Sequence, residues 1–251
     1  MTRRRFYAPP AVFDFDKGTV TLTAEEARHA RDVLRLRAGD EIYLFDGQGK
    51  EFRGILRGFA RAGAAVDALE EVEPARPESP LQLTLGISLL KGEKFDLVIQ
   101  KATELGVSRI VPILTERADV RPKAAAEAHN RISRWQRIAL EAAKQSGRAR
   151  SPQIDAPVVT NVWLNSGDFD GATKLFFSER QGRALRDSSP TNNPTHVTAA
   201  VGPEGGWSDE EIAQARKTNW EVVTLGGRTM RAETAAIAIV ALLQHRFGDL
   251  K

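Results

Sequence analysis

Several residue types are scarce or missing in this chain of 251 residues, which has no cysteine, two methionines, two tyrosines and four histidines. The lack of cysteine excludes disulfides, thiolate metal sites and cysteine nucleophiles, and it is consistent with a reducing compartment. The histidines (His29, His129, His196 and His245) have no spacing typical of metal ligands, so we expect no metal site. We also expect no membrane segment, because no apolar run reaches the roughly 20 residues that a spanning helix needs.

An excess of one charge sign is also missing, since 36 Lys and Arg residues face 33 Asp and Glu residues and leave a net charge of +3. Together with an isoelectric point near 9.3, this weakly indicates an anionic partner such as RNA, and an ordinary basic protein fits equally well. Arg3, Arg4 and Arg5 are followed by prolines and aspartates instead of a long apolar segment. We therefore expect no signal peptide and a cytoplasmic location.

The first 74 residues have the pattern of a small β-rich domain. Thr23 and Glu26 fit a capping box that begins a helix over Ala24–Leu36. Short apolar strands surround this helix and end in glycine turns, which is typical of a small barrel. The predicted strands are Thr19–Thr23, Glu41–Phe45, Lys50–Phe59 and Ala64–Val72. The proline-rich stretch that follows predicts a linker, which we place at residues 75–80.

From residue 81 to 251 strands alternate with helices, which predicts an α/β domain with a parallel sheet covered on both faces. The predicted strands are Leu81–Leu90, Arg109–Leu114, Lys174–Phe177, Thr195–Val201 and Glu221–Leu225. The predicted helices are Glu93–Leu105, Asn130–Gln145, Ser208–Asn219 and Ala232–Phe247, and residues 182–194 are predicted to form a loop. The last helix is apolar on nearly every face, so we expect it to be buried.

Two glycine-rich turns, Val201–Gly206 and Leu225–Arg228, follow predicted strands and lead into helices. Ligands of α/β proteins bind beyond the carboxyl ends of strands, and glycine lets backbone N–H groups approach them closely. Ser208 and Glu211 fit a capping box that begins the helix after the first turn. Neither turn matches the Gly-x-Gly-x-x-Gly or Walker A pattern, so a purely architectural role stays open beside a ligand site.

Both turns resemble the signature of the SPOUT class of RNA methyltransferases, with Gly-Pro-Glu-Gly-Gly at 202–206 and Leu-Gly-x-Arg-x-x-Arg-x-Glu-Thr-Ala at 225–235. The sequence is most similar to the RsmE-type subfamily, which methylates N3 of a uridine in 16S ribosomal RNA. The similarity extends to Lys91–Pro112 and Glu141–Arg148, and near the start of the chain to Arg5-Phe6-Tyr7 and His29–Ile42. It therefore covers nearly the whole sequence.

The resemblance implies a PUA-like β-barrel domain over residues 1–74 and a SPOUT methyltransferase domain over 81–251, with a trefoil knot in about 195–251. It also implies an antiparallel homodimer formed through the knot and the C-terminal helix, with 16S rRNA or the 30S ribosomal subunit as partner. The methyl donor would be S-adenosylmethionine, which leaves as S-adenosylhomocysteine, and no metal is implied. The implied donor contacts lie on three turns: Phe177, Ser178 and Glu179; Val201, Gly202, Pro203, Glu204, Gly205 and Gly206; and Leu225, Gly226, Arg228, Met230, Arg231 and Thr234.

Uridine N3 carries a proton at neutral pH and becomes a good nucleophile only when that proton leaves. Cations or N–H donors aimed at the two neighbouring carbonyl oxygens would stabilise the resulting anion. We assign this role to Arg231, with Arg228 as a second candidate or a phosphate anchor. Glu204 and Glu233 are candidate bases or partners of these arginines, and the partner role is favoured for Glu233 because a carboxylate suits the first turn of a helix. Thr234 is expected to cap that helix.

The predicted RNA-binding residues are basic: Arg3, Arg4, Arg5, Arg28, His29, Arg31, Arg35, Arg37 and Arg148. Most of them lie on or beside the first helix, where a solvated amphipathic face is the alternative explanation. For Arg148, a charge that complements a helix dipole explains the residue equally well. Two positions depart from the family pattern, because Ala118 stands in place of a serine and Lys144 in place of an acidic residue. Both departures put the placement of RNA in question.

Two other functions stay open at this point. A non-catalytic ribosome-assembly protein would keep the fold and the RNA binding without the activity, which the intact glycine turns disfavour. A SPOUT ribose 2′-O-methyltransferase would act on the sugar, which the similarity of the N-terminal domain to the uridine-N3 subfamily disfavours.

Overall fold

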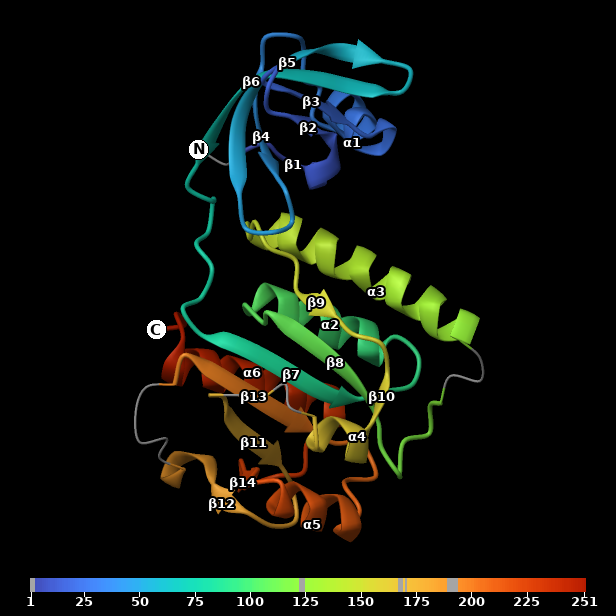
Figure 1. The fold of residues 1–251 in the computed structure, drawn as a ribbon, viewed down its shortest axis with the longest axis vertical. Helices are drawn as coiled ribbons and strands as arrows, with labels where there is room; N and C mark the ends of the chain where they lie inside the picture. The colour runs from blue at the N-terminus through green and yellow to red at the C-terminus, as the bar shows by residue number, and fades with distance from the viewer. Residues whose placement is uncertain (1–2, 122–124, 167–168, 170, 189–193) are drawn as a thin grey trace. The chain divides into compact units, whose positions relative to one another are not determined.

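The computed structural model describes residues 3–121, 125–166, 169, 171–188 and 194–251. The chain forms two compact units (Figure 1). The first unit extends to Glu78 and includes Leu140–Ser151, and the second contains Ser79–Ala139 and Pro152–Lys251. No helix within the described ranges is long and apolar enough to cross a membrane.

One six-stranded sheet, in the order β1-β4-β5-β6-β3-β2, forms the body of the first unit. Its strands are β1 (Arg5–Tyr7), β2 (Phe13–Asp14), β3 (Thr19–Leu22), β4 (Glu41–Phe45), β5 (Glu51–Ala60) and β6 (Gly63–Val72), and a 3-10 turn, η1 (Pro10–Val12), precedes β2. β1 and β4 run parallel, and the other neighbouring strands run antiparallel. Phe6, Ile42 and Leu56 are fully buried in the core beneath the sheet. The β-rich N-terminal domain that the sequence predicts is therefore confirmed.

The helix predicted over Ala24–Leu36 is shorter in the structure. α1 (Ala24–Arg28) begins after Thr23, whose side chain accepts the Glu26 N–H at 3.3 Å, as the pattern predicts. A π-helical turn, η2 (His29–Val33), follows directly. The backbone of Arg35 has a φ of 54°, which lies in the left-handed region, so the predicted helix does not continue to Leu36.

The second unit contains an eight-stranded sheet whose pairs are all parallel, in the order β10-β8-β7-β13-β11-β14-β12 with β9 beside β8. Its strands are β7 (Gln82–Ser88), β8 (Arg109–Leu114), β9 (Gln153–Ile154), β10 (Val158–Val159), β11 (Thr173–Phe177), β12 (Arg183–Ala184), β13 (His196–Val201) and β14 (Glu221–Thr224). This sheet confirms the predicted α/β class. The two-residue strands are too short to give a sequence pattern.

Helices cover both faces of this sheet. α2 (Lys94–Glu104), α6 (Ala232–Phe247) and part of α3 (Ala125–Ser146) pack on one face, and α4 (Thr160–Leu164) and α5 (Asp209–Lys217) pack on the other.

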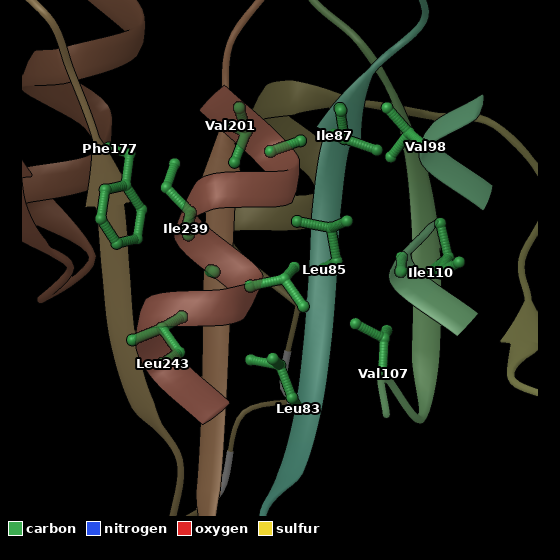
Figure 2. Packing of buried hydrophobic residues seen from close by; sticks show 14 of the residues in the cluster. Leu83, Leu85, Ile87, Val98, Val107, Ile110, Phe177, Val201, Ile239 and Leu243 are labelled. Carbon is green, nitrogen blue, oxygen red and sulfur yellow. The ribbon is translucent and has the colours of Figure 1, made fainter. Parts of the chain in front are cut away.

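Alternate residues of β7 belong to the two faces. Figure 2 shows Leu83, Leu85 and Ile87 of β7 in the same core as Ile239 of α6. Gly86 belongs to the opposite face, where an added Cβ would lie 2.1 Å from the ring of Trp163. Glycine at this position therefore lets α4 pack closely against the sheet.

Two sequence expectations change in the second unit. The apolar helix α6 is buried on one side only, because Leu242 is 43% exposed while Ile239 and Leu243 are buried. Within the single chain the expected burial is therefore seen on the side of the helix that faces the sheet, and the other side is open. Within the predicted loop 182–194, β12 and a 3-10 turn, η3 (Leu185–Asp187), are present, and residues 189–193 lie outside the described ranges.

Candidate functional site

Three turns meet at the carboxyl ends of the adjacent strands β13, β11 and β14 and enclose a cavity of about 520 Å³. This edge of a parallel sheet is where α/β proteins bind ligands. The residues that line the cavity are Phe177–Gly182, Val201–Gly206 and Thr224–Met230, together with Ala232, Ala235 and Ile239 of α6. The structure thus brings the two glycine turns and the turn after β11 together around one space.

Trp207 contacts both the first glycine turn and the end of β11. Its indole N–H donates to the carbonyl oxygen of Phe177 at 2.8 Å, and its side chain is buried. The ring lies so close to Gly202 that a Cβ there would be 2.9 Å from Nε1. One side chain therefore fixes both the end of β11 and the start of the turn after β13.

Gly206 ends this turn with a φ of +67°, which favours glycine. A Cβ at this position would lie 2.3 Å from a carboxylate oxygen of Glu179. The backbone of the first turn and the Glu179 side chain can approach this closely only because residue 206 lacks a side chain.

Glu211 connects the first turn to two other segments. Ser208 and Glu211 form the predicted capping box, with the Ser208 N–H donating to Oε2 at 3.0 Å. The other carboxylate oxygen accepts from the N–H of Glu116 at 3.1 Å and from the hydroxyl of Thr160 at 2.8 Å. Arg117 in turn donates to the carbonyl oxygen of Gly205 at 3.2 Å. Glu211 and Arg117 therefore fasten the segment after β8 to the glycine turn.

The second glycine turn needs glycine for its backbone conformation. Gly226 and Gly227 have φ values of +68° and +72°, and a Cβ at either position would meet nothing within 4 Å. The Gly226 N–H donates to Thr224 Oγ1 at 3.1 Å. The turn is exposed, so its remaining backbone groups are available to a ligand.

Charged side chains surround the cavity, and several of them pair with each other. Arg180 lies 3.3 Å from Asp209 and 3.6 Å from Glu179, and it donates to the carbonyl oxygen of Trp207. Glu204 pairs with Lys94 of α2. Within the described ranges Arg228 has no hydrogen bond or ion pair, so its guanidinium is available to an anionic or carbonyl group.

The predicted donor contacts lie around this cavity with two exceptions. Arg231 and Thr234 are exposed and do not line it, whereas the other predicted donor residues do. Thr234 does not cap α6 either, because the N-cap position is Arg231 and no side chain makes the capping bond. That prediction is wrong by one helical turn.

Glu233 belongs to a different cavity. It is 8% exposed and lines a space of about 530 Å³ together with Lys94, Gln100 and Arg134. One of its carboxylate oxygens has no hydrogen-bond partner in the described part of the chain. Neither Glu233 nor Glu204 pairs with Arg228 or Arg231 there, so the predicted locking of these arginines by carboxylates is not seen.

Three of the predicted RNA-binding arginines form internal contacts in the first unit. Arg5 is buried, donates to Glu51 at 3.0 Å and to the carbonyl oxygen of Arg148 at 2.9 Å, and lies over the ring of Phe45. Arg148 is buried and donates to Glu78 at 2.6 Å. Arg3 donates to Glu51 at 2.8 Å. These contacts give Arg5 and Arg148 a structural role, which sequence periodicity cannot distinguish from an RNA contact.

The other predicted RNA-binding residues lie nearer the solvent. Arg4, Arg28, Arg31, Arg35 and Arg37 are exposed, and Arg31 pairs with Asp32 at 2.7 Å. His29 is half-buried and packs edge-on against the ring of Phe6. The exposed arginines are therefore the ones that a polyanion can reach.

Lys144, one of the two departures from the family pattern, has an internal partner. Its Nζ lies 2.8 Å from both carboxylate oxygens of Glu26, and both side chains are largely buried. The ion pair explains how a lysine is accommodated where an acidic residue was expected. Ala118 lies in the turn after β8 and donates its N–H to Thr115 O at 3.3 Å, and nothing in the structure explains the change at this position.

Sequence reasoning missed the contacts that position the turns, namely those of Lys94, Arg117, Thr160, Arg180 and Trp207. Each of these contacts joins residues that are far apart in the chain, so no local sequence pattern predicts it. No group of three or more His, Cys, Asp or Glu side chains suited to a metal ion occurs among the described residues.

Both the N-terminal and the C-terminal parts of the chain match families of RNA methyltransferases. A family model described as an RNA methyltransferase domain matches residues 77–244, and one described as an RNA methyltransferase PUA domain matches residues 22–58. Ribosomal RNA small subunit methyltransferase E of Synechocystis is 35% identical over 243 residues, which are 96% of this chain and 77% of that protein. The protein of the same name from Bacillus subtilis is 28% identical over 235 residues, which are 91% of this chain and 90% of that protein.

Solved structures agree with the sequence matches. Ribosomal RNA small subunit methyltransferase E from Neisseria gonorrhoeae, bound to S-adenosyl methionine, superposes with a TM-score of 0.87 at 36% identity and covers 100% of both chains. The similarity that the sequence motifs indicate therefore extends to the three-dimensional structure over the full length.

Proposed function

The chain belongs to the ribosomal RNA small subunit methyltransferase E family, and from this premise we propose that it transfers a methyl group from S-adenosylmethionine to 16S rRNA. The acceptor atom is N3 of one uridine, and S-adenosylhomocysteine is the second product. The observation that carries the proposal is the cavity of about 520 Å³ that three turns form at one edge of the parallel sheet. No metal takes part in the proposed reaction.

The cavity suits a donor with an apolar base, a polar amino-acid end and a sulfonium. Leu225, Met230 and Ile239 supply apolar surface for an adenine ring, and the glycine turns supply backbone N–H and C=O groups for its edge. Glu179 and Glu204 are the carboxylates at the cavity, where Arg180 and Lys94 pair with them, and their oxygens attract a cationic donor. When bound, the donor supplies an electrophilic methyl group, and the protein holds that group toward the acceptor.

Arginines stabilise the uridine anion in the proposed reaction. Arg231 and Arg228 are exposed and have no ion pair within the described ranges, so both are available to the two carbonyl oxygens beside N3. Glu204 lines the donor cavity and Glu233 does not, which supports Glu204 as the group that accepts the N3 proton. Glu233 stays the second candidate.

The first unit binds RNA in this proposal. Arg4, Arg28, Arg31, Arg35 and Arg37 contact the rRNA backbone, because their guanidinium groups are exposed. Arg5 and Arg148 are not among the proposed contacts, since their hydrogen bonds are made within the protein.

The domain and assembly predictions complete the proposal. Residues 1–74 form a PUA-like RNA-binding domain, 75–80 a linker and 81–251 the catalytic domain, whose residues 195–251 form a knot. The position of β13 between β7 and β11, although it follows both in sequence, supports such threading. The exposed apolar side chain of Leu242 supports a homodimer through α6. The protein acts in the cytoplasm, where its rRNA substrate is made.

The experiment is methyl transfer from labelled S-adenosylmethionine to 16S rRNA taken from cells that lack this protein. We expect label in the rRNA, and nucleoside analysis is expected to identify it as 3-methyluridine. Normal donor and RNA binding with no transferred label would favour the ribosome-assembly protein. Label on a ribose oxygen would favour the 2′-O-methyltransferase.

A further inference from the structure

Two apolar side chains are exposed where η2 ends, at Val33 and Leu34. Val33 is 65% exposed and Leu34 is 39% exposed, whereas Leu36 is buried. The backbone is unusual at this place, because η2 is a π-helical turn and Arg35 has a φ of 54°. Both features are rare for ordinary residues and are often found at functional sites. The backbone therefore leaves Val33 and Leu34 exposed to solvent, while Leu36 packs into the core.

Unpaired arginines flank this apolar pair. The side chains of Arg28, Arg35 and Arg37 are exposed and form no direct hydrogen bond or ion pair with the described residues, although the charge of Arg28 also interacts with the nearby Asp32 carboxylate. This distinguishes them from Arg31, which pairs with Asp32. Exposed guanidinium groups that are not held in a direct ion pair are available to a polyanion, so charge complementarity favours a nucleic acid as the partner.

We infer that Val33 and Leu34 form an apolar wedge that contacts the faces of unpaired nucleobases in the rRNA, while Arg28, Arg35 and Arg37 hold the flanking phosphates. This inference rests on the proposed function. Phosphate contacts need no apolar group, and base faces are hidden in a continuous RNA helix. Sequence-specific RNA recognition uses loops, bulges and ends because their bases are unstacked there. Aliphatic side chains such as leucine also serve as wedges between base steps in other nucleic-acid complexes.

The test measures binding of the full-length protein to two synthetic RNAs, a hairpin with a bulged loop and a blunt duplex of equal length, over a series of salt concentrations. The double variant Val33→Ser/Leu34→Ser removes the wedge without changing charge. Ile55→Ser is the matched control, since Ile55 lies on β5 of the same unit and is also 39% exposed. Arg35→Gln removes one proposed phosphate contact and leaves an uncharged polar side chain in its place.

We expect the wedge variant to bind the bulged hairpin about tenfold more weakly with an unchanged salt slope. Its affinity for the blunt duplex is expected to stay at the wild-type value, and Ile55→Ser is expected to behave as wild type on both RNAs. Arg35→Gln is expected to weaken binding to both RNAs and to reduce the salt slope by about 0.7.

Three outcomes overturn the inference, and they differ in whether the proposed function is overturned as well. Equal binding of the bulged hairpin by the wedge variant and the wild type removes the wedge and leaves the proposed function intact. A wild-type protein that binds neither RNA nor 16S rRNA removes the proposed function as well. If the wedge variant changes the sedimentation of the RNA-free protein from dimer to monomer, the apolar pair contacts a second copy of the chain instead.

Discussion

Replacing Trp207 with phenylalanine tests how the first glycine turn is held. The indole N–H donates to Phe177 O at 2.8 Å in a site from which water is excluded. Phenylalanine has no such donor, and a buried acceptor that loses its partner costs about 1–3 kcal/mol. Because Phe177 and Gly202 both line the cavity, we also expect S-adenosylmethionine to bind about tenfold more weakly, which corresponds to about 1.4 kcal/mol.

Trp220→Phe is the matched control for this prediction. Trp220 is buried in the same cluster as Trp207, but its indole N–H has no partner in the described part of the chain. Both variants lose the same atoms, so the difference between them isolates the hydrogen bond. Urea unfolding is expected to give a larger loss of stability for Trp207→Phe by about 1–3 kcal/mol, and calorimetry is expected to give normal donor affinity for Trp220→Phe. Equal stability and equal donor affinity of the two variants would refute the reasoning.

Three further predictions concern the cavity, the chemistry and the first unit. Gly206→Ala places a Cβ 2.3 Å from Glu179 and keeps a φ of +67°, so calorimetry is expected to show donor affinity reduced by about tenfold or more. Arg231→Ala is expected to lower the rate of methyl transfer by about 10²–10³ with unchanged donor affinity, and a normal rate would remove Arg231 from the mechanism. Lys144→Glu places a second carboxylate beside that of Glu26, and the repulsion is expected to lower the unfolding free energy by roughly 2–4 kcal/mol. The added exchange Glu26→Lys is expected to restore most of that loss, and a double variant as unstable as the single one would contradict the pairing.

Local chemistry made parts of this fold predictable. The capping residues Thr23 and Ser208 mark two helix starts that the structure confirms. Alternating strands and helices predict a parallel sheet, and glycine turns after strands predict a cavity at its edge. These features depend on residues that are neighbours in sequence, which is why a single sequence reveals them.

Long-range contacts explain what the sequence did not reveal. The burial of Arg5 depends on Glu51 and on the carbonyl oxygen of Arg148, both distant in sequence, so a basic residue that completes a core looks like one that binds RNA. The same holds for Glu211, whose capping role is local and whose bonds to Glu116 and Thr160 are not. The sequence of α6 predicts burial on every side, because its apolar composition does not show which side faces the sheet.

The most direct measurement of the central claim is a crystal structure of the protein grown with S-adenosylmethionine. The account predicts the donor in the cavity between the turns after β11, β13 and β14, with its adenine beside Leu225 and Met230 and its methyl group directed toward Arg228 of the second glycine turn. A donor bound elsewhere on the chain, or a correctly folded protein that takes up none, would contradict it.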